Sequence, residues 1–172
     1  MKAPVPVNFP KAKKSIIVLP FEDISPGKDN EYFSDGLTEE IITDLSHVHD
    51  LLVISRGSAM TFKGTKKTIP EIASEVNVRY VLEGSVRKAG NSLRITAQLI
   101  DAANDVRLWA EKYSGMLDDV FDIQEKVSRS IVKALKLMLT SDETRKITAP
   151  NNTFTKLGLM LKNAKVLTIS TQ

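Results

Sequence analysis

The sequence predicts an α/β fold: a mixed sheet of about five strands in the order β-α-β-α-β-β-β-α, with parallel βα units followed by an antiparallel meander, flanked by helices. Three observations predict it. Two continuous apolar runs of strand length each precede a stretch with helical periodicity. Three segments with strict apolar–polar alternation then follow one another with short loops. Strand–helix–strand units give parallel pairing, and consecutive alternating strands give a meander.

The first strand is the run SIIVLPF, residues 15–21. A continuous β-branched run is typical of a strand buried on both faces, so we expect it near the centre of the sheet. Residues 22–30 are rich in Asp, Pro, Gly and Asn and are expected to form a loop. A helix is predicted at residues 34–48, with Ser34 or Asp35 as its cap. Its apolar stripe consists of Leu37, Ile41, Leu45 and Val48.

A second buried strand is predicted at residues 51–56, LLVISR, followed by a loop at residues 57–67. Thr68 and Glu71 fit the capping-box pattern and predict the start of a short helix. Asn77 is a suitable left-handed stop for that helix. The residues expected to point inward are Ile72, Ala73 and Val76.

Three alternating segments, residues 79–88, 93–101 and 106–113, predict strands with one apolar and one polar face. For the apolar faces of the first two strands to match, the loop between them must have an even number of residues, either 89–90 or 89–92. Matching the last two pairs Leu99 with Leu108. The inner face then holds Tyr80, Leu82, Gly84, Val86, Leu93, Ile95, Ala97, Leu99, Val106, Leu108 and Ala110. The outer face holds Glu83, Ser85, Arg87, Arg94, Thr96, Gln98, Arg107, Trp109, Glu111 and Tyr113.

A long helix closes the pattern, capped by Asp118 or Asp119 and reaching about Thr140. Its expected buried stripe is Phe121, Val127, Ile131, Leu135 and Met138. We therefore expect a linker at residues 1–14, one α/β domain at 15–140, and a basic tail at 141–172 in which a further helix is left open.

Charge is distributed unevenly along the 172 residues, whose net charge is +3. Residues 15–140 hold 15 basic and 19 acidic residues, so that segment carries 15 − 19 = −4. The flanks hold the other 9 basic and 2 acidic residues, which gives 9 − 2 = +7. Proteins that bind nucleic acids usually gather Lys and Arg on a folded face, so we do not expect the core to bind nucleic acid.

Cysteine is absent, which excludes disulfides, thiolate chemistry and cysteine-based zinc sites. No run approaches the about 18 apolar residues that span a bilayer, so no membrane span is predicted. No apolar signal-like region is visible near the N-terminus. These features favour a cytoplasmic location and leave a periplasmic one open if a membrane anchor lies upstream.

Catalytic constellations are not evident. Gly57 and Gly64 are separated by six residues, more than a phosphate-binding loop allows. His47 and His49 lie two apart near a helix end, a poor spacing for a shared metal. The carboxylate pairs are adjacent in sequence, so their members do not face each other, and no serine has a recognisable histidine partner. We therefore predict no catalytic residue, cofactor or metal site, and no enzyme activity in this chain by itself.

Trp109, the only tryptophan, marks the best candidate surface. Trp, Tyr and Arg are enriched at binding hot spots. The outer face of the meander is therefore predicted to meet a protein partner or a neighbouring domain through Arg94, Arg107, Trp109, Glu111 and Tyr113. The alternative is that a helix of the same domain covers this face and makes Trp109 part of the core.

Four blocks in order, covering about residues 15–139, resemble the TolB amino-terminal-like domain family: IIVLPFEDIS, EYFSDGLTEEIITDLS, VRYVLEGSVRKAGNSLRITAQLIDA and RLWAEKY, the last followed by the FDIQEKV helix. The resemblance implies a mixed α/β domain, distantly similar to the TolB amino-terminal domain and to the flagellar FlgO and curli CsgG groups. Members of the family are not known as catalysts in themselves. They commonly lie in bacterial regulators between an adenylate/guanylate cyclase, winged-helix or kinase domain and tetratricopeptide repeats.

The function that the resemblance implies is a non-catalytic protein-interaction or sensory coupling domain of a bacterial multidomain signalling protein. Two alternatives stay open, a periplasmic envelope-assembly factor and a sensor domain for a small ligand or nucleotide. We expect the SDGLTEE and LEGSVR blocks to be mainly structural, because Gly84 on the inner face leaves room for a close approach.

Overall fold

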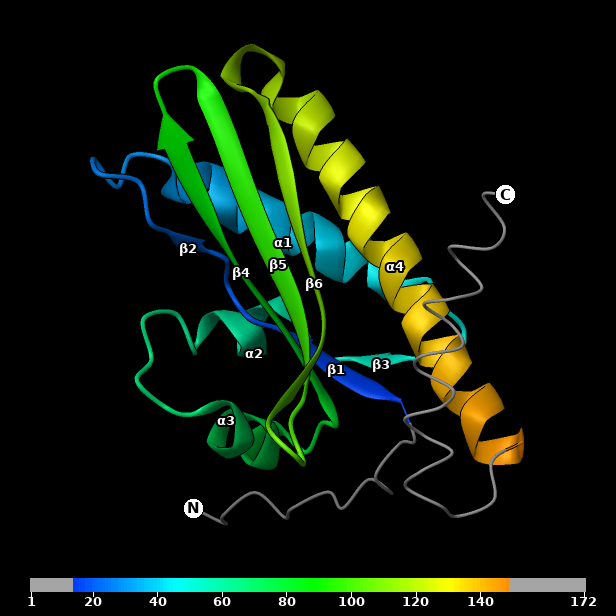
Figure 1. Cartoon of the computed structure of the whole chain (residues 1–172). Coiled ribbons are helices and arrows are strands. Elements are labelled where there is room, and N and C mark those ends of the chain that lie inside the picture. The colour runs from blue at the N-terminus through cyan, green and yellow to red at the C-terminus, as the bar shows by residue number, and fades with distance from the viewer. Residues whose placement is uncertain (1–13, 149–172) are drawn as a thin grey trace, which may run out of the picture. The chain divides into compact units, whose positions relative to one another are not determined.

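The computed structural model of the chain describes residues 14–148 (Figure 1). These residues fall into two compact units divided between Lys133 and Ala134, and the sheet with all the sites discussed below lies in the first. The predicted linker, apart from Lys14, and the tail beyond Thr148 lie outside the described residues. The elements are β1 (Ser15–Val18), β2 (Glu22–Asp23), α1 (Glu31–Ser46), β3 (Leu52–Val53), α2 (Arg56–Met60), α3 (Ile69–Val76), β4 (Tyr80–Ala89), β5 (Ser92–Asp101), β6 (Val106–Met116), the 3₁₀ turn η1 (Leu117–Asp119) and α4 (Val120–Thr148).

The sheet of the described residues has six strands in the order β3-β1-β4-β5-β6, with β2 paired to β4. Strand β1 pairs in parallel with β3 and β4, and β2 pairs in parallel with β4. The β4–β5 and β5–β6 pairs are antiparallel. This arrangement confirms the predicted mixed sheet with parallel βα units and a meander.

Strand β1 lies between β3 and β4 and is buried along its whole length, as the apolar run predicted. It is shorter than expected and ends at Val18. The chain stays beside β4 for one more residue, since the Leu19 N–H donates to the Leu82 carbonyl at 2.9 Å. Pro20 has no N–H to continue the ladder, and pairing resumes only at β2.

Helix α1 begins at Glu31, three residues before the predicted cap. Asn30 occupies the cap position without a side-chain capping bond. Its N–H instead donates to the Asp23 carboxylate at 2.8 Å, and its side-chain amide donates to Ser25 Oγ at 3.1 Å. The stripe Leu37, Ile41 and Leu45 is buried as predicted, whereas Val48 is half-buried.

Strand β3 has only two residues because the sequence after it starts a helix that the sequence analysis missed. The Ser55 side chain accepts a hydrogen bond from the Ser58 N–H and caps α2. Helix α3 follows the prediction closely. Thr68 and Glu71 form the capping box, and Asn77 has the left-handed conformation with φ of 56°.

The β4–β5 pair has the register of the second predicted alternative, the loop of residues 89–92, with Leu82 opposite Leu99 and Val86 opposite Ile95. The two-residue turn at residues 90–91 requires a positive φ, which Gly90 supplies at 60°. The predicted β5–β6 register is wrong. A bulge between Leu99 and Ile100 places Leu99 opposite Trp109 rather than Leu108. One extra residue in β6 therefore reverses the faces of the strand beyond that point.

Helix α4 begins at Val120 and extends past the predicted end to Thr148. The buried positions Ile123, Val127 and Ile131 recur every four residues. Phe121 lies off this stripe and is 86% exposed, so its predicted burial is wrong. Leu135 is buried and Met138 half-buried.

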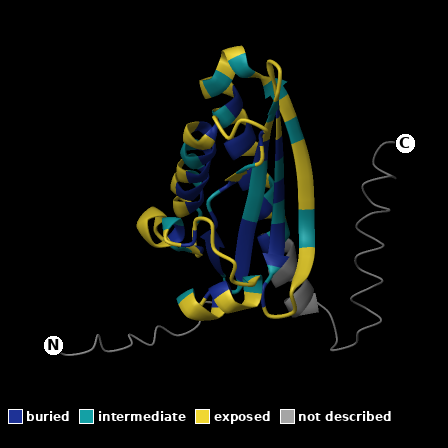
Figure 2. Cartoon of the chain, turned by 90° about the vertical axis from the view of Figure 1, so that its left-hand side faces the viewer, coloured by how far each residue is buried: buried dark blue, intermediate teal, exposed yellow. Residues whose placement is uncertain are grey.

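The helices α1 and the first part of α4 cover one face of the β4–β6 meander, and much of β4 and β5 is dark in Figure 2 while β6 is largely exposed. A Cβ on Gly36 of α1 would lie 2.8 Å from Gln124 of α4, and one on Gly115 of β6 would lie 2.7 Å from Ile123. On the other face, α3 packs at the end of β4 where Val81 and Ile100 are buried. Residues 62–67 lie across a cleft from Glu83, Ser85, Thr96 and Gln98 on this face, and its β6 part carries the exposed side chains of Arg107 and Lys112.

Candidate interaction surface

The second face of the meander carries four exposed basic side chains. Arg87 of β4 lies directly opposite Arg94 of β5. Lys112 of β6 lies opposite Thr96, and Arg107 lies opposite Ile100. We call Arg87, Arg94, Arg107 and Lys112 the basic sheet face. The alternation of the strands puts all four on the side away from α1 and α4.

Each of these four side chains lacks an ion pair or hydrogen bond within residues 14–148. Other basic residues of the domain are engaged: Arg56 Nε lies 3.2 Å from Glu39, and Lys67 Nζ lies 2.6 Å from Glu75. Like charges placed directly opposite on adjacent strands destabilise a sheet. The Arg87–Arg94 pair therefore has no stabilising role inside the described part of the domain.

The bulge divides the predicted partner surface between two faces. Arg94 and Arg107 are exposed on the uncovered face as expected. Trp109, Glu111 and Tyr113 lie opposite the inward-facing residues of β5, Leu99, Ala97 and Ile95 respectively. The prediction that all five side chains share the outer face is therefore wrong.

Trp109 and Tyr113 are half-buried at the edge of the helix-covered face. Burial and the neighbouring Glu111 carboxylate raise the pKa of Tyr113 to about 12. Trp109 therefore lies on the helix-covered face of the edge strand β6 and not on the outer face.

A cleft of about 630 Å³ opens beside the basic sheet face, at the carboxyl end of β1. In sheets with parallel strands this is where ligands usually bind. Its wall is formed by the segments after β1 and α2 and by the middle of β4 and β5. Its lining combines apolar and polar side chains, including Phe21, Phe62, Ile72, Glu83, Ser85 and Gln98.

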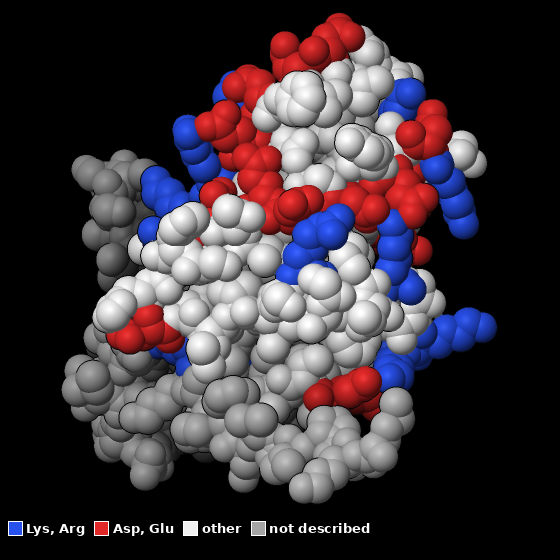
Figure 3. Space-filling view, turned by 180° about the vertical axis from the view of Figure 1, so that it is seen from behind, with Lys and Arg blue, Asp and Glu red and all other residues white. Residues whose placement is uncertain are grey.

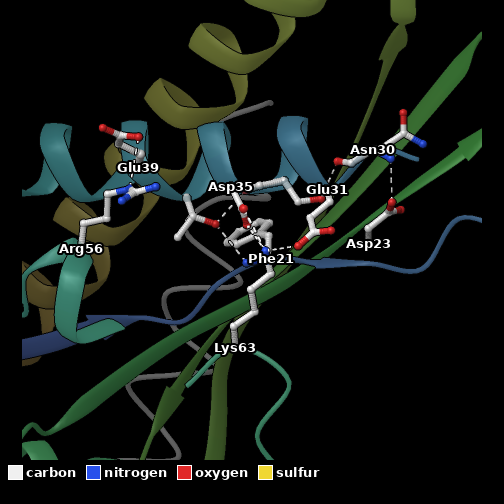
Figure 4. A network of polar contacts seen from close by, with 10 residues as sticks. Phe21, Asp23, Asn30, Glu31, Asp35, Glu39, Arg56 and Lys63 are labelled. Atoms are coloured by element: carbon white, nitrogen blue, oxygen red, sulfur yellow. Dashed lines mark hydrogen bonds and ion pairs between the residues drawn. The ribbon is translucent and has the colours of Figure 1, made fainter. Parts of the chain in front are cut away.

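The polar groups at this cleft are held in a structural network (Figure 4). Lys63 forms ion pairs with Glu31 and, at 2.8 Å, with Asp35. These contacts raise the pKa of Lys63 above its usual value. The Phe21 N–H donates to Thr38 Oγ1 at 2.9 Å, so the start of the cleft is fixed to α1.

Asp23 organises the loop between β2 and α1. Its carboxylate accepts the N–H groups of Ser25 at 3.0 Å and Asn30 at 2.8 Å. Burial acts to raise the pKa of Asp23, but the hydrogen bonds from Ser25 and Asn30 and the charge of Lys28 together hold it below its ordinary value. This carboxylate is therefore a loop-ordering group, since its lone pairs are occupied by backbone donors.

No group of three or more His, Cys, Asp or Glu side chains in the described residues could hold a metal ion. His49 lies 3.4 Å from Asp50, and both are exposed at the end of α1. None of the helices within residues 14–148 has the length and apolar content that a bilayer crossing requires.

The helix layer is acidic on its outer side, where Asp and Glu side chains form a band with Lys and Arg among them (Figure 3). We call the α1 residues Glu31, Asp35, Glu39, Glu40 and Asp44 the acidic belt. Burial, with the neighbouring charges of Asp44 and Glu125, raises the pKa of Glu40. Asp44 also accepts a hydrogen bond from the buried Ser128 of α4 at 2.8 Å.

Comparison with known families identifies the domain type. The family described as HilA/YgeH-like transcriptional regulator, second domain, matches residues 12–136. The chain belongs to this family. The HilA/YgeH-like second domain thus accounts for the whole sheet and for the α4 residues up to position 136.

A curated relative of this HilA/YgeH-like domain is "Putative adenylate cyclase 3" of Rhizobium meliloti (strain 1021). The two are 51% identical over 132 residues, which is 77% of this chain and 22% of the relative. The chain therefore spans about a fifth of the curated relative that it matches.

One solved structure shares the fold at low sequence identity, and a second is given for comparison only. Protein XCC0632 from Xanthomonas campestris has a TM-score of 0.52 and 10% identity, with 80% of this chain and 92% of that chain covered. TolB from Acinetobacter baumannii has a TM-score of 0.48 and 18% identity, with 71% of this chain and 28% of that chain covered.

Proposed function

We propose that this chain is a non-catalytic protein-interaction and coupling domain of a bacterial multidomain signalling protein, working in the cytoplasm. The observation that carries the proposal is the set of basic side chains on the outer face of the meander. An antiparallel sheet commonly leaves one face in water, so this face is distinguished by its charge. Here one face carries four basic side chains without partners in the described residues. Such a face is suited to contact another protein surface.

The matches with known proteins support the coupling part of the proposal. The family is described as the second domain of a transcriptional regulator, and the 51% identical segment belongs to a protein named as a putative adenylate cyclase. Those two names imply different outputs. A domain common to both is better suited to receive or pass on a signal than to generate either output.

The cleft supports the non-catalytic part of the proposal. Several of its charged groups are engaged in contacts that order the domain: Asp23 with backbone N–H groups, and Lys63 with Glu31 and Asp35. Glu83 accepts a hydrogen bond from Gln98. A general acid or base must be free to reach a substrate proton, and these groups already have partners.

Two measurements test the proposal. The purified chain should not turn over ATP or GTP. A chimera in which this chain replaces the matching 132 residues of the Rhizobium protein should keep whatever cyclase activity that protein has. Replacing Arg87 and Arg94 by Glu in the chimera should change how that activity is regulated. Turnover by the isolated chain that one substitution abolishes would refute the non-catalytic assignment.

A second candidate function, sensing a small ligand, is favoured by the cleft of about 630 Å³, a size typical of ligand pockets. Thermal denaturation in the presence of nucleotides and amino acids tests it. A ligand that raises the midpoint of the wild-type chain, but not of a Ser85→Trp variant whose side chain fills the cleft, supports the sensor. Ser74→Trp, on the exposed side of α3, is the control.

A further inference from the structure

We propose that the basic sheet face of one copy docks onto the acidic belt of a second copy, so that the chain associates head to tail. This rests on the proposed function and names the partner of the same surface. The end of the acidic belt at Glu40 and Asp44 lies beside α4 in the helix layer, whereas the basic sheet face lies on the other side of the meander. One copy can therefore use both patches at once, each toward a different neighbour.

The basic sheet face requires an anionic partner. Arg87 and Arg94 lie directly opposite each other without a carboxylate partner in the described residues. Such a pair is unfavourable in the free domain and becomes favourable when negative charge is brought between the two guanidinium groups. Arg107 and Lys112 extend the same charge along β6.

The shape of the face suits a helix. Thr96, Ala110 and Ser114 on this face are short, and Gln98, which lies opposite Ala110, donates a hydrogen bond to Glu83. The short side chains between the charged ones allow a helix to approach the sheet closely. A helix laid on the open face would add a second layer to the antiparallel meander.

Nucleic acid fits the face less well. The basic sheet face has no aromatic side chain between its four charges, since Trp109 and Tyr113 lie on the other face. A platform for single strands stacks bases on aromatic rings. The predicted domain at residues 15–140 also carries 15 − 19 = −4, which opposes approach of a polyanion.

The acidic belt supplies the matching helix. Along α1, Glu40 lies near the carboxylates of Asp44 and Glu125, and Arg129, which pairs with Glu125, is also close. Lys63 and Arg56 neutralise only Glu31, Asp35 and Glu39 at the other end of the belt. The carboxylates near Glu40 and the guanidinium groups near Arg94 are therefore complementary. Because the two patches differ, the contact is heterologous and yields rings or open chains.

Sedimentation of the full chain tests this contact. The weight-average mass should rise with protein concentration up to the millimolar range. It should return to the monomer value between about 0.1 M and about 1 M salt, as the Debye length falls from about 10 Å to about 3 Å. Arg94→Glu and Glu40→Lys should each weaken association about tenfold. Lys66→Glu, an exposed loop change of equal charge, should not.

Mixing the two weakened variants separates this arrangement from other contacts. The Glu40→Lys chain keeps an intact basic sheet face, and the Arg94→Glu chain keeps an intact acidic belt. The mixture should therefore form dimers that neither variant forms alone. A chain that stays monomeric throughout, association that Arg94→Glu leaves unchanged, or a mixture without dimers would overturn the proposal. Tight binding of duplex DNA that Arg94→Glu abolishes would reassign the face to nucleic acid. Each result is independent of nucleotide turnover, which tests the proposed function.

Discussion

Gly84 is the position where a single added methyl group should reveal how the domain is packed. A Cβ at Gly84 would lie closer than 3.0 Å to the ring of Phe21 and to the carbonyl oxygen of Thr96. Phe21 is buried, and the Thr96 carbonyl belongs to the neighbouring strand, so neither can move into solvent. Gly84→Ala should therefore be strongly destabilising.

The expected loss in the free energy of unfolding of Gly84→Ala combines two opposing contributions. Overpacking a core costs about 1–3 kcal/mol, and a rigid backbone partner places Gly84→Ala near the upper end. Replacing Gly by Ala also restricts the unfolded chain, which returns about 0.4–1 kcal/mol. The net loss is then about 2 kcal/mol, and Gly84→Val should lose more because it adds two further carbons.

Urea denaturation measures the effect. With a slope of about 2 kcal/mol per molar urea, the midpoint should fall by roughly 1 M while the slope stays constant. Gly57→Ala is the matched control, because a Cβ there meets nothing within 4 Å. In a Phe21→Leu background the Gly84→Ala penalty should shrink, since the ring contact is gone. An unchanged midpoint in Gly84→Ala, or equal penalties in both backgrounds, would refute the packing account.

Three further substitutions and one pH series make separate predictions. Thr38→Val should cost about 1–3 kcal/mol in urea because it leaves the Phe21 N–H buried without an acceptor, while Thr38→Ser should cost less. Arg94→Thr should raise the free energy of unfolding by about 0.2–1 kcal/mol by removing the repulsion from Arg87; a loss would mean that Arg94 has a structural partner. The pKa of Asp23 is lowered by folding, so its stabilisation is present above its unfolded pKa of about 3.9 and lost as pH falls through the folded value; Asp23→Asn should flatten this acid limb. Glu40 has a raised pKa, so its charge costs stability as pH rises above its unfolded pKa of about 4.3, and Glu40→Gln should stabilise the domain at neutral pH.

Local signals in the sequence were sufficient for several elements. The capping box at Thr68 and the left-handed Asn77 depend on neighbouring residues only, and both are confirmed. The β4–β5 register followed from parity, because both strands bury alternate residues and the turn between them is tight. The central place of β1 followed from apolar residues on both of its faces.

Other features depend on contacts distant in sequence. Helix α1 starts early because Asp23 binds the Asn30 N–H, a contact across seven residues that no local pattern reveals. The β6 sequence keeps its period-two alternation, so the pattern does not reveal the bulge. The bulge nevertheless moves Trp109 to the helix-covered face. Arg94 was assigned correctly because it precedes the bulge partner Ile100 in a regular part of β5.

Chemical labelling of single cysteines tests most directly whether the uncovered sheet face is the surface through which this domain acts. The chain has no cysteine, so Ser114→Cys on that face and Ser74→Cys on α3 each provide a single reactive thiol. Maleimide labelling of each site, followed by mass spectrometry of its peptide, is compared between the dilute isolated chain and the Rhizobium chimera. The account predicts that maleimide labels position 114 more slowly in the chimera than in the isolated chain, while the labelling rate at position 74 is the same in both. Equal labelling of both sites in the isolated chain and in the chimera would contradict it.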